Sequence, residues 1–180
     1  HENYLMDRAT PFWRIVQHAT THFVTRQIFT GAGKVGSEAP WKTLDEVPFQ
    51  LTQRADFFET EVALDTMVKR PIVNTRDEPH ADREKYRRLH VIVGDSNMSE
   101  YTIYLRNGVT ALVISMIEDG AMPDGLGLRD PVRAIKQVSH DPSCKVELAM
   151  ESGKKLTAVQ LQSEYLESAL RYTPGREIDP

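Results

Sequence analysis

The sequence is poor in cysteine and has no long apolar run. Its single cysteine, Cys144, excludes an internal disulfide and a zinc site built from cysteines, which is typical of a reducing cytoplasm. No apolar stretch is long enough to cross a bilayer, and no secretory signal opens the chain. The formal net charge is only −4, so composition predicts no general attraction to nucleic acid or membrane surfaces. We therefore expect a cytoplasmic protein with neither nucleic-acid nor membrane partners.

The 180 residues suffice for one ordinary domain or for a large piece of something bigger. Because the chain begins at His1 rather than at a methionine, we expect a segment of a longer polypeptide. Hydrophobic residues make up 40% and charged residues 27%, as in globular proteins. Helix-like and strand-like stretches are interspersed without a βαβ rhythm, which favours an α+β fold with an antiparallel sheet.

Capping residues and helical spacing predict helices at 10–20, 99–119, 130–138 and from 157 onwards. Gly108 could mark a break in the second of these. Apolar and β-branched residues predict strands at 23–30, 49–54, 71–75 and 89–93, and a hairpin that joins 145–150 to 154–156. Gly, Pro and Ser predict a surface loop at 31–48, while 55–64 fit either a short helix or an irregular connector.

The dominant polar feature is residues 70–100, where charges of both signs and two histidines lie between two apolar strands. Because side chains alternate along a strand, some of these are expected to share a sheet face. The two expected sets are Asn74, Arg76 and Glu78, and separately Arg88 and His90.

Such a face would suit a nucleoside triphosphate with a divalent metal. Guanidinium groups bind phosphate oxygens and neutralise charge that develops there. Carboxylate, imidazole and amide groups supply the hard ligands that magnesium prefers. The alternative is a solvated loop whose mutual salt bridges are each worth less than about 1 kcal/mol. Residue types alone leave these two interpretations equally supported.

Other motifs are weaker. The glycines at 31–36 superficially match a dinucleotide fingerprint but lack its βαβ context, and they do not form a P-loop. His18, His22 and His140 show no ligand spacing and are expected at the surface or at helix ends. There is no Gly-x-Ser-x-Gly motif and no evident base for Cys144, so nucleophilic serine or cysteine chemistry has little support.

Two long strings, residues 74–82 and 86–100, resemble the Pup-processing enzymes of actinobacteria, a family of carboxylate–amine ligase type. Further matching stretches lie at 1–5, 24–27, 31–35, 53–55, 131–135 and 162–170, so the resemblance covers nearly the whole chain. It implies a glutamine synthetase-like fold, in which a curved antiparallel sheet has helices packed on one face. The concave face of that sheet would hold ATP and magnesium.

The resemblance also implies roles for individual residues. Arg76 and His90 are expected at the reacting groups, with Arg76 on phosphate and His90 on metal or a phosphate oxygen. The expected nucleotide-binding residues are Arg76, Arg88, His80 and Asn97, and the expected metal ligands are His1, His90 and Glu78. Residues 1–180 would form the central portion of the large catalytic domain. The acidic magnesium ligands, the catalytic aspartate and the small C-terminal domain would lie outside this chain, so the chain alone would supply part of a site.

Within this family, 49–59 and 62–71 are closer to the deamidase/depupylase branch, whereas 95–100 and 138–141 fit the ligase branch comparably well. The balance favours ATP- and magnesium-dependent hydrolysis of the amide at the C-terminal glutamine of Pup, or of the Pup–lysine isopeptide bond. The partners would be Pup and pupylated proteins of the proteasome pathway. One alternative is a ligase that forms the isopeptide through a γ-glutamyl phosphate. Another is a non-catalytic fragment that binds Pup or nucleotide.

Overall fold

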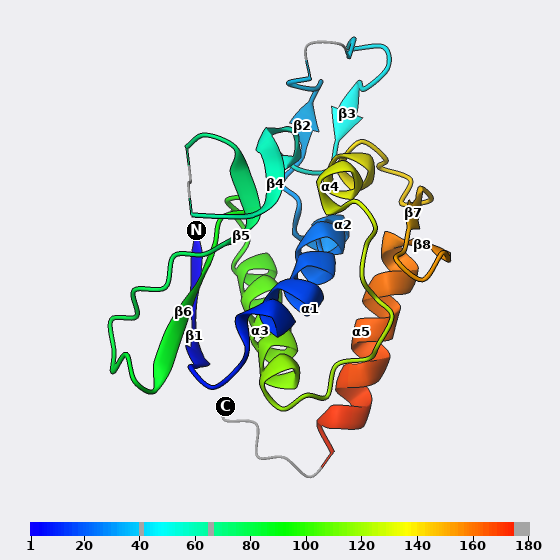
Figure 1. The fold of residues 1–180 in the computed structure, drawn as a ribbon. Helices are drawn as coiled ribbons and strands as arrows, with labels where there is room; N and C mark the ends of the chain where they lie inside the picture. Colours follow the sequence, from blue (N-terminus) through cyan, green and yellow to red (C-terminus); the bar gives the residue numbers. More distant parts are fainter. Residues whose placement is uncertain (40–41, 65–66, 175–180) are drawn as a thin grey trace.

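The computed structural model describes residues 1–39, 42–64 and 67–174. Short paired strands and longer helices alternate along the chain, which confirms the α+β class. In Figure 1 the strand pair β1 and β6 forms the left side, and α1, α3 and α5 lie to its right. None of the helices in the described residues combines the length and apolar character that a membrane crossing requires.

Helix α1, Phe12–Thr25, is the central helix and packs against α3, α4, α5 and β5. It begins after Pro11, which is extended, and no side-chain hydrogen bond caps it, so the capping residue expected at the start of the helix predicted at 10–20 is not confirmed. The predicted strand at 23–30 is also wrong, because α1 continues to Thr25 and α2 follows at Gln27–Thr30. Every residue of 19–25 is buried. A helix end buried on all sides loses its amphipathic period, and β-branched residues then resemble a strand.

The other predicted helices are confirmed as α3 Glu100–Glu118, α4 Pro131–Ser139 and α5 Ala158–Tyr172. Gly108 does not interrupt α3. At the start of α4 the Arg133 backbone N–H donates to Asp130 Oδ1 over 2.9 Å. At the start of α5 a complete capping box forms, in which Gln160 N–H donates to Thr157 Oγ1 and Thr157 N–H to Gln160 Oε1. These local caps explain why the helix starts were predictable.

The strands in the described residues form four separate two-stranded pairs rather than one continuous ladder. The antiparallel pairs are β1 Glu2–Asp7 with β6 Tyr86–Val91, β2 Lys34–Val35 with β3 Phe49–Gln50, and β7 Glu147–Ala149 with β8 Lys155–Thr157. The fourth pair, β4 Phe58–Ala63 with β5 Arg70–Asn74, is parallel, which differs from the expected purely antiparallel sheet.

The strands predicted at 71–75 and 89–93 are confirmed as β5 and β6, although their first and last residues differ from the prediction. The hairpin predicted at 145–156 is confirmed as β7 and β8. The strand predicted at 49–54 is reduced to β3. The predicted loop at 31–48 contains the short β2, and residues 40–41 lie outside the described residues. Residues 55–64 combine a 3₁₀ turn, Ala55–Phe57, with β4.

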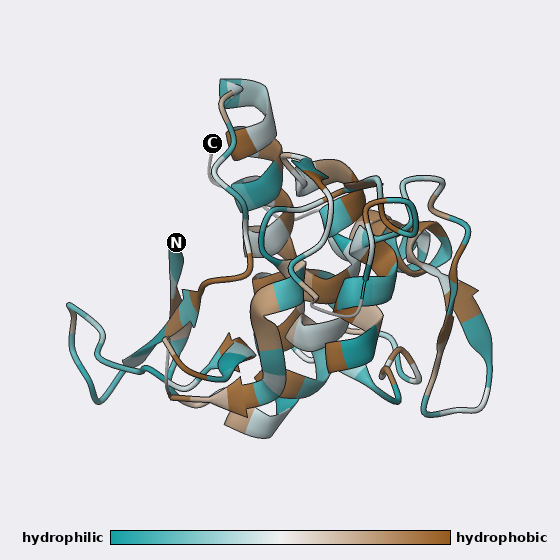
Figure 2. Ribbon diagram, turned by 90° about the horizontal axis from the view of Figure 1, so that it is seen from above, coloured by the Kyte–Doolittle hydropathy of each residue, from teal (hydrophilic) through white to brown (hydrophobic). Residues whose placement is uncertain are grey.

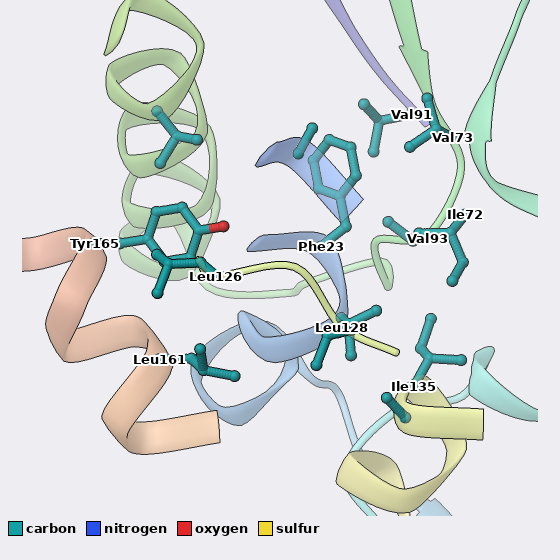
Figure 3. Packing of buried hydrophobic residues seen from close by; sticks show 14 of the residues in the cluster. Phe23, Ile72, Val73, Val91, Val93, Leu126, Leu128, Ile135, Leu161 and Tyr165 are labelled. Carbon is teal, nitrogen blue, oxygen red and sulfur yellow. The ribbon is translucent and has the colours of Figure 1, made fainter. Parts of the chain in front are cut away.

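One hydrophobic core joins the helices to the strands. In Figure 3 Phe23 of α1 lies between Val91 and Val93 on one side and Tyr165 of α5 on the other. Ile72 extends the core to β5, and all these side chains are at most 7% exposed. The core thus fixes β5 and β6 against α1, and the polar segment between these strands follows the buried Asn74 and leads to the exposed Tyr86.

The connection from β2 to the 3₁₀ turn is held by the Asp56 carboxylate, whose side chain is 3% exposed. Its Oδ2 accepts from Gln50 Nε2, Ser37 Oγ and Glu38 N–H over 2.8–2.9 Å, and its Oδ1 lies 2.7 Å from His140 Nε2. Burial alone would raise the pKa of Asp56, but these hydrogen bonds outweigh it and lower the pKa to about 2. One buried carboxylate therefore ties three segments together.

Replacing Asp56 with asparagine is predicted to lower the free energy of unfolding by about 2 kcal/mol at neutral pH. The folded pKa lies below the ordinary value of 3.8, so this stabilisation is present above that value and is lost as pH falls towards about 2. Denaturant unfolding between pH 6 and pH 2 should show the difference between wild type and Asp56→Asn shrinking over that lower window. The exposed Asp45→Asn is the matched control. A wild-type-to-variant difference that stays constant with pH would contradict the role of Asp56.

Candidate functional site

The β1–β6 ladder separates a buried face from a polar one. Its register pairs Asn3 with His90 and Leu5 with Arg88, while Met6 and Leu89 are buried on the side of the helices. Directly opposed residues of an antiparallel pair share a face. The prediction that Arg88 and His90 lie on the same side of the strand is therefore confirmed.

His90 is the best-defined member of the polar face, and its neighbours set its proton arrangement. Its Nδ1 lies 2.8 Å from Asn3 Oδ1, and its ring meets the His1 ring edge-on with 5.2 Å between centroids. An amide oxygen can only accept, so Nδ1 carries the hydrogen and Nε2 keeps a lone pair. Burial lowers the pKa of His90, and the charges of Arg88 and Arg76 lower it further. A neutral imidazole with a free lone pair can bind a metal ion or accept a hydrogen bond.

The segment between β5 and β6 begins with a turn that ends the strand. The Asn74 side chain is buried, and its Oδ1 accepts the Arg76 backbone N–H over 2.8 Å. Such a side-chain turn competes with the ladder, so β5 stops at Asn74. Asn74, Arg76 and Glu78 would share a sheet face only if the strand persisted to Glu78, and it does not. Figure 2 shows the following loop, at the left edge, as almost wholly hydrophilic.

This loop is fixed by ion pairs to β6 and to Arg8, the residue that follows β1. Arg88 Nη2 donates to Glu78 Oε2 over 2.9 Å, and the Arg88 backbone N–H donates to Asp77 Oδ1 over 3.1 Å. Asp77 also forms an ion pair with Arg8. Arg76, Arg88, Glu78 and His1 are thereby gathered around His90. The Glu78 carboxylate is already paired with Arg88, which reduces its availability to a metal.

A pocket of about 240 Å³ opens beside this group, between the first turn of α1 and the loop. Three arginines line it, Arg76, Arg87 and Arg88, together with one acidic residue, Asp77. The Nε atoms of Arg87 and Arg88 are buried and have no hydrogen-bond partner among the described residues. Buried donors without partners favour an anionic ligand that can accept from them. Arg87 was not among the predicted site residues, since strand alternation had singled out Arg88 and His90.

Two predicted site residues stand apart. His80 is exposed in the loop, and no hydrogen bond or ion pair places it at the pocket in the described structure. Asn97 lies beyond β6, where its Nδ2 donates to Thr30 O over 2.9 Å and its Oδ1 accepts from Arg106 Nη1 over 2.9 Å. Its amide is therefore engaged within the fold, beside α2 and α3 rather than beside His90.

Behind the ladder lies a buried ion pair that sequence reasoning missed. Arg26 is 1% exposed and donates to both Glu2 oxygens over 2.6 and 2.9 Å. Tyr4 Oη donates to the same carboxylate over 2.6 Å, and Arg26 Nη1 donates to Thr110 Oγ1 over 2.6 Å. Burial would raise the pKa of Glu2, but Arg26 outweighs it and the pKa is lowered. The sequence of β1 held no such signal, because Tyr4, Leu5 and Met6 are all apolar and only the structure shows that Glu2 is buried.

Gly94 makes room for this ion pair. A Cβ atom at Gly94 would lie 2.4 Å from Glu2 Oε1 and 3.4 Å from Arg26 Nη2. His22 borders the same cluster, with Nε2 3.2 Å from Thr110 Oγ1. Its side chain is fully buried rather than at the surface, but it lies in the last turn of α1, which agrees with the helix-end alternative. Burial and Arg26 lower its pKa well below the usual range. His140 also lies at a helix end, as the C-cap residue of α4.

Replacing Arg26 with methionine is predicted to lower the free energy of unfolding by about 3–5 kcal/mol, because it leaves the Glu2 carboxylate buried without a partner. The double variant Glu2→Leu/Arg26→Met should be less destabilised than Arg26→Met alone. Denaturant unfolding of the wild type, both single variants and the double variant measures this coupling. Additive effects of the two single substitutions would contradict a buried pair.

Comparison with known proteins places this geometry in a family. Residues 1–179 match the model of the family described as "Pup-ligase protein". A depupylase of Acidothermus cellulolyticus is 58% identical over 98% of this chain and 34% of its own length. A Pup–protein ligase of Gordonia bronchialis is 47% identical over the whole chain and 39% of its own length. The chain thus spans little more than a third of the curated relatives it matches.

Solved structures agree. The ligase PafA in its complex with Pup superposes with a TM-score of 0.82 and 37% identity, over 94% of this chain and 33% of that one. PafA in complex with ADP gives a TM-score of 0.81 and 39% identity, over 95% of this chain and 37% of that one. This agreement confirms the expected glutamine synthetase-like fold. The match over residues 1–179, the identities and the superpositions together show that the chain belongs to the Pup-ligase protein family.

Proposed function

We propose that this chain carries the nucleotide-phosphate-binding wall of an ATP- and magnesium-dependent Pup deamidase/depupylase. The supporting observation is the convergence of Arg76, Arg87 and Arg88 on one pocket beside a neutral His90. Buried guanidinium donors without partners suit phosphate oxygens, which accept bidentate hydrogen bonds. That one solved relative is a complex with ADP is consistent with nucleotide binding in the family.

The proposed roles follow from exposure and charge. Arg76 is exposed and no hydrogen bond of its guanidinium is found in the described residues, so it is available to a phosphate. Arg88 would donate to the same phosphate ligand while it keeps its ion pair with Glu78. The Nε2 atom of His90 would bind a metal ion through its lone pair, or would accept a hydrogen bond from a donor on the ligand. If ligand binding protonated Nε2, it would donate a hydrogen bond to a phosphate oxygen instead. The assignments of His80 and Asn97 to the nucleotide and of His1 to the metal remain proposals, and Asn97 would have to exchange its bonds to Thr30 and Arg106.

Magnesium would neutralise phosphate charge when bound. Across the described ranges no group of three or more His, Cys, Asp or Glu side chains could hold a metal ion. His1, His90 and Glu78 would therefore be contributors to a site that draws further carboxylates from elsewhere. A metal site completed by other segments agrees with the proposal that this chain is the central portion of a larger catalytic domain. We propose the cytoplasm as the place where that domain works.

Hydrolysis is favoured over ligation by similarity. The depupylase relative is 58% identical and the ligase relative 47% identical over nearly the same residues. The substrates would be the C-terminal glutamine amide of Pup and the isopeptide bond in pupylated proteins of the proteasome pathway. The ligase is the second candidate, because the two solved structures compared above are both of the ligase PafA. Its reaction would form the isopeptide through a γ-glutamyl phosphate.

The Arg76→Ala variant is predicted to weaken ATP binding by about tenfold or more, since it removes a charge-assisted contact to phosphate. The host should be a polypeptide that joins this chain to the segments its relatives have beyond the matched third. Calorimetry with Mg-ATP measures binding, and turnover of glutaminyl Pup and of a pupylated protein should fall strongly. Arg83→Ala, an exposed arginine of the same loop, is the matched control. Wild-type binding and turnover in Arg76→Ala would exclude the assigned role.

The same host separates the candidate functions. Release of ammonia or of a free lysine side chain, with ATP conserved, indicates the deamidase/depupylase. Stoichiometric ADP release with a new isopeptide on a target lysine indicates the ligase. Binding of Pup or nucleotide with no turnover of either kind indicates the non-catalytic alternative.

A further inference from the structure

A second pocket, of about 460 Å³, lies on the outer side of α1 and carries the opposite charge. It is bounded by α1, by β4, by residues 127–128 and by Glu151 in the turn after β7. It shares Phe12 with the arginine-lined pocket, so the two are neighbours. Its charged lining residues are Glu61 and Glu151, and no lysine, arginine or histidine lines it.

The two carboxylates have no compensating cation. Neither Glu61 nor Glu151 takes part in an ion pair within the described residues. Burial raises the pKa of Glu61, and the charge of Glu151 raises it further. Like charges at a partly desolvated site repel each other, and a cation between them would relieve that repulsion.

The Thr20 hydroxyl is an independent sign of a missing ligand. Thr20 is 2% exposed, lines the same pocket, and its Oγ1 has no hydrogen-bond partner in the described residues. The Thr20 hydroxyl is close enough to the Glu61 carboxylate to lower the pKa of Glu61 somewhat against the effect of burial. The two groups nevertheless do not meet the geometric criteria of a hydrogen bond. A buried hydroxyl without a partner destabilises the folded state, so it favours a ligand that completes its hydrogen bonding.

Gly127 allows the second carboxylate to approach the pocket. The Glu151 backbone N–H donates to Gly127 O over 2.9 Å, and a Cβ atom at position 127 would lie 2.3 Å from Glu151 Oε2. Any side chain at Gly127 would therefore push the carboxylate away. Because the displaced group is the free end of a flexible side chain, Gly127→Ala should move it without unfolding the protein.

From these contacts we propose that the pocket binds a primary ammonium group on an aliphatic stem, the chemistry of a lysine side chain. An ammonium has three donors and no acceptor, and Glu61, Glu151 and Thr20 present three acceptors. Its stem would lie against the apolar walls at Phe12 and Val62. A metal fits less well, since the described residues hold no cluster of three metal-binding side chains. The inference concerns a second pocket, apart from the arginine-lined one, and it is tested without nucleotide or Pup, so its failure and the failure of the proposed function are distinguishable.

The test is a titration of the ¹⁵N-labelled chain with Nα-acetyl-lysine N-methylamide, followed by NMR. Saturable shifts are expected at the Trp13 indole and the Gly127 amide, which border the pocket. Glu61→Gln and Gly127→Ala should each weaken binding by about tenfold, the size of one charge-assisted contact. Glu164→Gln, an exposed carboxylate on α5, is the matched control and should bind as the wild type does. Thermal melting confirms that each variant is folded.

Three comparisons decide the ligand class. The norleucine analogue, which has the stem without the ammonium, should not bind; equal affinity would overturn the proposal. Displacement of the lysine probe by equimolar magnesium chloride would assign the pocket to a metal and also overturn it, as would the absence of saturable shifts. Putrescine separates two sources of the same chemistry. Tighter binding of the lysine analogue supports a polypeptide lysine, and tighter binding of putrescine supports a free amine.

Discussion

The buried contact between Arg26 and Glu2 holds the candidate site in place. Two oxygens of one carboxylate accept from one guanidinium in a region where both side chains are almost inaccessible to water. Such a pair is strongly destabilising when one partner is removed, so it restricts where β1 can lie relative to α1. Because side chains alternate, fixing Glu2 inwards fixes Asn3 outwards, opposite His90. The tautomer of His90 thus depends on a contact on the other side of the strand.

Charge is segregated around the first turn of α1. Three arginines converge on one pocket and two glutamates line the next, with Phe12 in the wall of both. Residues that line each pocket have buried polar atoms without a hydrogen-bond partner in the described part of the chain: the Nε atoms of Arg87 and Arg88 for one pocket, and Thr20 Oγ1 for the other. Unsatisfied buried groups are rare in folded proteins, and here they coincide with unbalanced charge. Both features are typical of binding surfaces.

Much of the helical structure was predictable because its signals are local. The Asp130 cap and the Thr157–Gln160 capping box involve residues within one turn, and both form as expected. The failures have a different origin. The buried end of α1 has no polar face, so its residues were predicted as a strand. The parallel pairing of β4 with β5 depends on how the two strands pack in the fold, and no local sequence pattern predicts the direction in which they pair.

The sequence by itself determined the family, the α+β class, most of the helices and the concentration of phosphate-binding residue types between two apolar strands. The tertiary structure alone decided which of those residues meet. It gathered Arg76, Arg88, Glu78 and His1 around His90, added Arg87, and placed Asn97 beside Arg106 instead. It also buried Glu2, His22 and Arg26 in one cluster. The physical reason is that helix caps and strand alternation act over a few residues, whereas burial and charge pairing depend on segments distant in the chain.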